Sequence, residues 1–126
     1  MEQHLDLSAT TRDAELGHAL SLRSAGLMEV LRITKRVRSA DGGLRFSGVP
    51  ASTTSSVRGL EVSFVENGAA PAPSLDPVSG FIRLFYPKRE EHEVIELLES
   101  KRRRFCYFWR SRDDAFKHAW LLSSPQ

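Results

Sequence analysis

The chain has 126 residues, of which 40% are hydrophobic and 27% are charged, and its formal net charge is +2. This length and balance predict one globular domain, residues 1–126, and exclude an intrinsically disordered chain. The longest apolar stretches span only a few residues, which is too short for a membrane-spanning helix, so we expect no membrane partner. No basic and apolar leader follows Met1, and Cys106 is the only cysteine. A cytoplasmic location is therefore the default expectation.

The first 26 residues support more than one interpretation. Residues 4–8 alternate between apolar and polar types, as a short strand does. Residues 13–22 fit a helix that Gly17 would weaken, whereas residues 18–23 also fit a strand.

Residues 28–49 predict a β-hairpin, with strands at 28–38 and 43–49 around the turn-forming pair Asp41-Gly42. A two-residue turn sets Val37 opposite Phe46 and also sets Arg38 opposite Arg45. Because like charges directly opposed are unfavourable, either the register slips near Gly42 or this face is built to hold positive charge. Arginine suits the second role, since its planar fork binds phosphate and carboxylate groups. The candidate anion-binding residues are Arg32, Arg36, Arg38 and Arg45; the alternative is a solvated outer face.

Two further strands are predicted, separated by a long connection. Residues 58–66 alternate so that Leu60, Val62 and Phe64 share one buried face. Residues 69–80 form a Pro-rich loop of a length that is often functional. Residues 81–86 carry bulky side chains on both faces, which is typical of a strand covered on both sides.

The principal helix is predicted near residues 88–101. Glutamates 90, 91 and 93 lie near its start, and the cations that begin at Lys101 lie near its end, so both groups complement the helix dipole. An apolar stripe that includes Val94, Leu97 and Leu98 gives this helix one buried face.

The chain then enters a basic and aromatic strand, residues 103–110, with Phe105, Tyr107 and Trp109 on one face and Cys106 and Phe108 on the other. Residues 112–123 fit either a helix or a strand that closes a hairpin, and the helix is favoured because residues 111–114 have capping-box spacing. Cations beside aromatic rings are what single-stranded nucleic acid binding requires. The candidate residues are Arg102, Arg103, Arg104, Tyr107, Trp109 and Arg110. The competing interpretation is that the arginines end a helix and the aromatic rings belong to the core.

Together these elements predict an α+β fold, in which a mainly antiparallel, curved or partly closed sheet packs against the principal helix, and an OB-like barrel is one form of it. We find no catalytic motif, no metal-ligand spacing and no cofactor motif, so no cofactor is expected. The leading hypothesis is a small non-enzymatic protein whose curved sheet holds a ligand or a protein partner, including a second copy. The alternatives are a protein that binds single-stranded nucleic acid or another polyanion, and an enzyme whose site assembles from distant residues.

Overall fold

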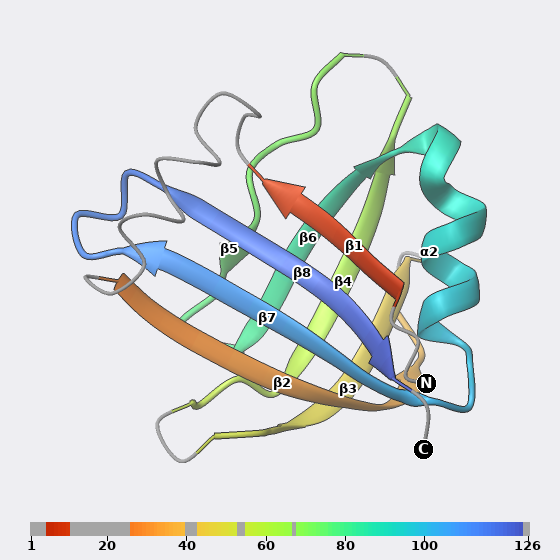
Figure 1. The fold of residues 1–126 in the computed structure, drawn as a ribbon, viewed down its shortest axis with the longest axis horizontal. Coiled ribbons are helices and arrows are strands. Elements are labelled where there is room, and N and C mark those ends of the chain that lie inside the picture. Colours follow the sequence, from red (N-terminus) through yellow and green to blue (C-terminus); the bar gives the residue numbers. More distant parts are fainter. Residues whose placement is uncertain (1–4, 11–25, 40–42, 53–54, 67, 125–126) are drawn as a thin grey trace.

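The computed structural model describes residues 5–10, 26–39, 43–52, 55–66 and 68–124. Strands and helices follow one another along these residues, and one sheet contains every strand (Figure 1). In chain order they are β1 (Leu5–Thr10), β2 (Gly26–Val37), β3 (Leu44–Pro50), β4 (Gly59–Val65), β5 (Ser74–Leu75), β6 (Phe81–Pro87), a 3-10 turn (Lys88–Glu90), α2 (Glu91–Leu98), β7 (Arg103–Ser111) and β8 (Lys117–Ser124).

The sheet has the strand order β1-β8-β7-β2-β3-β4-β6-β5 and curls into a half-barrel. Strands β1, β8, β7 and β2 form one side, β4 and β6 cross behind them, and α2 lies at one open end (Figure 1). β4 and β6 pair in parallel, while their neighbours pair in antiparallel fashion. The sheet is therefore mixed, and neither a mainly antiparallel sheet nor an OB-like barrel is confirmed.

The concave side of the curled sheet holds the core. Alternate residues from each long strand point into it, including Leu31, Phe46 and Leu84, and α2 adds Val94 and Leu97. All of these side chains are nearly or completely buried. Because successive side chains along a strand point to opposite faces, the residues between these core positions lie on the outer surface of the half-barrel.

Helix α2 confirms the predicted principal helix but is shorter than residues 88–101. It ends at Leu98, and β7 begins five residues later. The Arg104 guanidinium donates hydrogen bonds to the Leu98 carbonyl oxygen and, at 2.9 Å, to the Thr34 carbonyl oxygen. A carbonyl at a helix end has no partner within the helix, so Arg104 supplies that partner and ties the end of α2 to β2.

The predicted β2–β3 hairpin forms, and its register near the turn differs by one residue from that of a two-residue turn, which is the slip given as one of the two alternatives. Val37 faces Arg45, and Arg36 faces Phe46, so Arg38 and Arg45 are not opposed. The register also shifts between Ile33 and Lys35. A bulge of this kind leaves one residue unpaired and reverses which face the following side chains take. The predicted turn at residues 41 and 42 lies outside the described residues.

The helix favoured for residues 112–123 was wrong, because β8 is a strand over Lys117–Ser124 that pairs with β7. The Asp113 carboxylate accepts hydrogen bonds from the Ser111 hydroxyl at 2.6 Å and from the Ala115 backbone N–H at 3.1 Å. Asp114 has a φ of 63°, a left-handed conformation that ends any helix. The capping-box spacing therefore belongs to a hairpin turn.

Other predicted segments are confirmed in part. The predicted strand at 58–66 is β4, and the one at 81–86 is β6. The Pro-rich connection at 69–80 contains the short edge strand β5, which pairs with β6. The alternation at residues 4–8 corresponds to β1, which pairs with β8. The helix considered at 13–22 lies outside the described residues.

Removal of one inward ring tests the orientation of β7. Phe108 is 1% exposed in the core, so Phe108→Ala is expected to lower the free energy of unfolding by about 3–5 kcal/mol. Urea denaturation measures this change, and Phe105→Ala on the outer surface is the matched control with a smaller loss. A loss below about 1 kcal/mol for Phe108→Ala would show that β7 is oriented the other way.

Candidate functional site

The outer surface of β2, β7 and β8 is apolar and aromatic where an exposed sheet surface is usually polar. Phe105 and Tyr107 alternate with the core residues of β7, and their strand partners on β8 are Leu122 and Trp120. All four side chains are half-buried. We name this surface the aromatic face and define it as Val30, Phe105, Tyr107, Trp120 and Leu122.

The rings of the aromatic face lie close to one another. The Phe105 and Tyr107 rings have centroids 6.5 Å apart and are tilted by 50°. Tyr107 pairs directly with Trp120 on β8 and with Val30 on β2. Side chains on directly opposed residues lie within contact range, so three rings from two strands form one continuous platform.

Trp109, in contrast, is not part of this open platform. It lies on the same side of β7 as Tyr107 but is only 2% exposed. Its indole packs over Gly26, where a Cβ atom would come within 2.2 Å of the indole Nε1. Its strand partner His118 is 1% exposed. The sequence-based interpretation that places the aromatic rings in the interior therefore holds for Trp109 and not for Tyr107.

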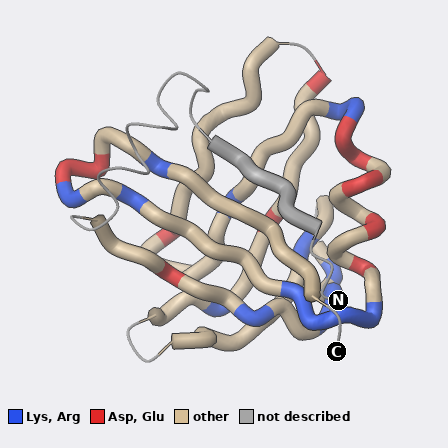
Figure 2. The backbone as a smooth tube through the Cα atoms, viewed as in Figure 1, with Lys and Arg blue, Asp and Glu red and all other residues tan. Residues whose placement is uncertain are grey.

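The structure brings two separately predicted arginine groups to one end of the sheet. Arg32 pairs with Phe105, and β2 ends beside the start of β7. Figure 2 shows cations gathered there, below the acidic α2. The exposed cations that we name the basic end are Arg32, Lys35, Arg38, Lys101, Arg102 and Arg103. Arg32 and Arg103 belong to the outer side of their strands, so the basic end adjoins the aromatic face.

Three of the other candidate arginines bond to groups within the protein. Arg36, turned by the bulge, forms a 2.6 Å ion pair with Glu99 just after α2. Arg104 bonds the end of that helix, and desolvation lowers the pKa of its guanidinium. Arg45 lies on the outer surface of β3, opposite Val37, and pairs with Glu61. The fourth, Arg110, lies at the far end of β7, opposite Lys117.

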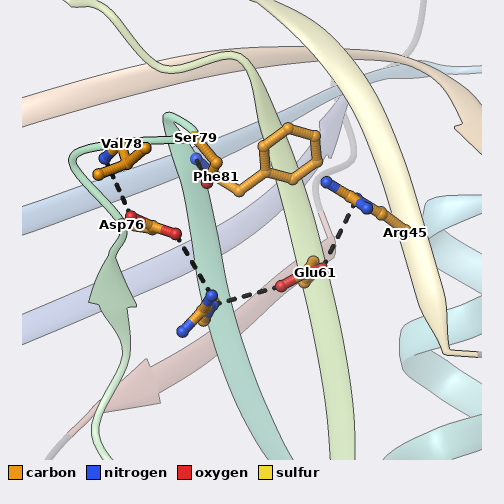
Figure 3. Close-up of polar contacts among 7 residues, drawn as sticks. Arg45, Glu61, Asp76, Val78, Ser79 and Phe81 are labelled. Carbon is orange, nitrogen blue, oxygen red and sulfur yellow. Dashed lines mark hydrogen bonds and ion pairs between the residues drawn. The ribbon is translucent and has the colours of Figure 1, made fainter. Parts of the chain in front are cut away.

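Arg45 belongs to a ladder of alternating charges on the outer surface of β3, β4 and β6 (Figure 3). Glu61 pairs with Arg45 at 3.6 Å and with Arg83 at 3.3 Å, and Arg83 also reaches Asp76 at 3.3 Å. Arg45 further lies 4.2 Å over the Phe81 ring. The Val78 backbone N–H holds the pKa of Asp76 below its usual value. The charged side chains on this half of the outer surface are therefore paired with one another, beside the half-buried rings of Phe81 and Phe85 on β6.

A groove lies between α2 and the adjoining ends of β3 and β4. This groove has a volume of about 350 Å³ and an apolar floor that includes Leu44, Phe64 and Ile95. Its cations are Arg36, paired with Glu99, and Lys88, whose ammonium lies 2.9 Å from Glu91. That hydrogen bond raises the pKa of Lys88. These charges are already engaged within the protein.

The described residues contain no group of three or more histidine, cysteine or acidic side chains that could hold a metal ion. Nor do the helices among them include one with the length and apolarity to cross a bilayer. Comparison with protein-family models, with curated proteins and with solved structures found no match.

Sequence reasoning named Arg32, Arg102, Arg103 and Tyr107 as candidates but missed Trp120. Residues 118, 120 and 122 alternate as a strand, and that signal was available. It was outweighed by the capping-box spacing, which placed Trp120 on a helix and hid its pairing with Tyr107.

Cys106 offers a test of the interior. It is 0% exposed, and burial raises the pKa of its thiol. Because the thiolate is the reactive form, a thiol-specific reagent is expected to leave native protein unmodified and to label Cys106 only on unfolding in urea. Rapid stoichiometric labelling of native protein would show that this side of β7 is open.

Proposed function

We propose that this protein is a non-enzymatic binding protein and that its ligand docks on the aromatic face. The observation that carries the proposal is the contrast between the two halves of the outer surface. On the half formed by β3, β4 and β6 the outward rings Phe81 and Phe85 lie among the residues of the charge ladder, whereas on the other half Phe105 and Tyr107 have Leu122 and Trp120 as strand partners on β8. Polar side chains interact with water more favourably than such rings do, and contiguous apolar patches on a protein surface commonly mark binding sites.

The edges of the patch support the same conclusion. Met28 on β2 is 37% exposed and Val49 on β3 is 46% exposed. Val49 pairs with Arg32, and Met28 pairs with Trp109, so both belong to the outer side. The apolar surface therefore continues from β8 across β7 and β2 to the end of β3.

The aromatic face also has a composition suited to binding. Tyrosine and tryptophan supply large contact areas with few rotatable bonds, and they are enriched where binding energy is concentrated. A protein partner, a second copy of the chain and a smaller ligand all fit the proposed role. A single domain and a cytoplasmic location remain predictions of the sequence.

The proposal requires that the aromatic face is dispensable for folding. The double substitution Tyr107→Ser and Trp120→Ser is expected to lower the free energy of unfolding by less than about 2 kcal/mol, because cross-strand pairs contribute roughly 0.2–1 kcal/mol each. Binding of an environment-sensitive apolar dye to native protein is expected to fall in the same variant. Phe108→Ser, which points inward from the same strand, is the matched control and should be far more destabilising.

A loss above about 4 kcal/mol for the double variant would contradict the proposal. It would mean that another part of the chain covers these rings as core.

A further inference from the structure

We infer that the occupant of the aromatic face is a single strand of nucleic acid, bound with its bases on Phe105, Tyr107 and Trp120 and its phosphates on the basic end. This inference rests on the proposed function and names the partner class for the same face. Its basis is that flat stacking surfaces and an exposed cluster of cations adjoin on one side of the sheet.

The charged side chains at the described outward positions of β2, β7 and β8 are all cations. Arg32 pairs with Phe105 across β2 and β7, and Arg103 precedes Phe105 by two residues on the same side of β7. Among the described outward positions of β2, β7 and β8 there is no acidic residue. On the neighbouring β1, Asp6 holds the register position opposite Leu122.

The cations of the basic end are also exposed, as a phosphate contact requires. Arg32, Arg38, Arg102 and Arg103 all lie in the exposed class, whereas Arg36, Arg45 and Arg104 bond to groups within the protein. Of the exposed arginines, Arg32 and Arg103 lie directly beside Phe105. Arginine is suited to phosphate because its guanidinium presents paired donors in a plane.

The rings have an arrangement suited to successive bases. Phe105 and Tyr107 follow each other along β7 with centroids 6.5 Å apart, and Trp120 lies across from Tyr107 on β8. Base stacking on aromatic side chains tolerates any sequence because every base has a π-face. Unpaired strands expose those faces, whereas a duplex buries them, so the inference is specific to single strands.

The test uses fluorescein-labelled ten-nucleotide oligo(dT) and oligo(U) with the full chain at low ionic strength, measured by fluorescence anisotropy. Binding is expected for both oligonucleotides, with an affinity that falls as salt rises. Tyr107→Leu and Trp120→Leu are each expected to weaken binding by roughly 5- to 150-fold, since they remove a stacking ring but keep the surface apolar. Phe85→Leu, on the outer side of β6, is the matched control and should leave the affinity unchanged.

The phosphate contacts have a separate signature. Arg32→Ala and Arg103→Ala are each expected to reduce the slope of log affinity against log salt by about 0.7, the value for one phosphate contact on a single strand. Arg89→Ala, which removes an exposed cation beside α2, should leave the slope unchanged.

Three results would overturn the inference. The first is the absence of oligonucleotide binding at low ionic strength. The second is binding that the two leucine variants do not weaken and that inorganic polyphosphate displaces equally well, which would identify a general polyanion site. The third is a protein that does not bind oligonucleotide and that sediments as a dimer, which the leucine variants dissociate. A second copy of the chain would then occupy the aromatic face. The proposed function would stand in that case. The serine double variant tests the proposed function independently of all three.

Discussion

Burial of Cys106 and Phe108 on the concave side of the sheet is the constraint on which the functional surface depends. Both side chains are at most 1% exposed. Because side chains alternate along a strand, burial of these two directs Phe105 and Tyr107 outward, and strand pairing then directs Trp120 and Leu122 to the same side. The burial of Cys106 and Phe108 therefore also fixes the outward orientation of the aromatic face.

A second constraint organises the end of the sheet where α2 stops. The register shift after Ile33 turns Arg36 toward Glu99, and Arg104 bonds the carbonyl oxygens of Leu98 and Thr34. These contacts satisfy the helix end and anchor it to β2. They also engage Arg36 and Arg104 with groups of the protein, and the basic end consists of neighbouring cations in the sequence.

The sequence was sufficient to predict features that depend on local alternation or composition. The hairpin, β4, β6 and the existence of α2 follow from such patterns, and so does the division of β7 into two faces. The parallel pairing of β4 with β6 was not predictable in this way, since it is a contact between two strands that a long connection separates in the sequence. The β2–β3 register near the turn differs from that of a two-residue turn, and a second shift follows between Ile33 and Lys35, which the alternation of residue types did not reveal. The convergence of Arg32 with Arg103 depends on β2 pairing with β7, residues about seventy positions apart in the chain.

The claim that the aromatic face is open while its neighbour Trp109 is enclosed is tested most directly by collisional quenching of single-tryptophan variants. The chain has two tryptophans, so Trp109→Phe reports on Trp120 alone and Trp120→Phe reports on Trp109 alone. Acrylamide is expected to quench Trp120 in the native protein much more strongly than Trp109, and unfolding in urea should make the two equal. Equal and strong shielding of both indoles in the native state would contradict the account, because it would place Trp120 in the interior.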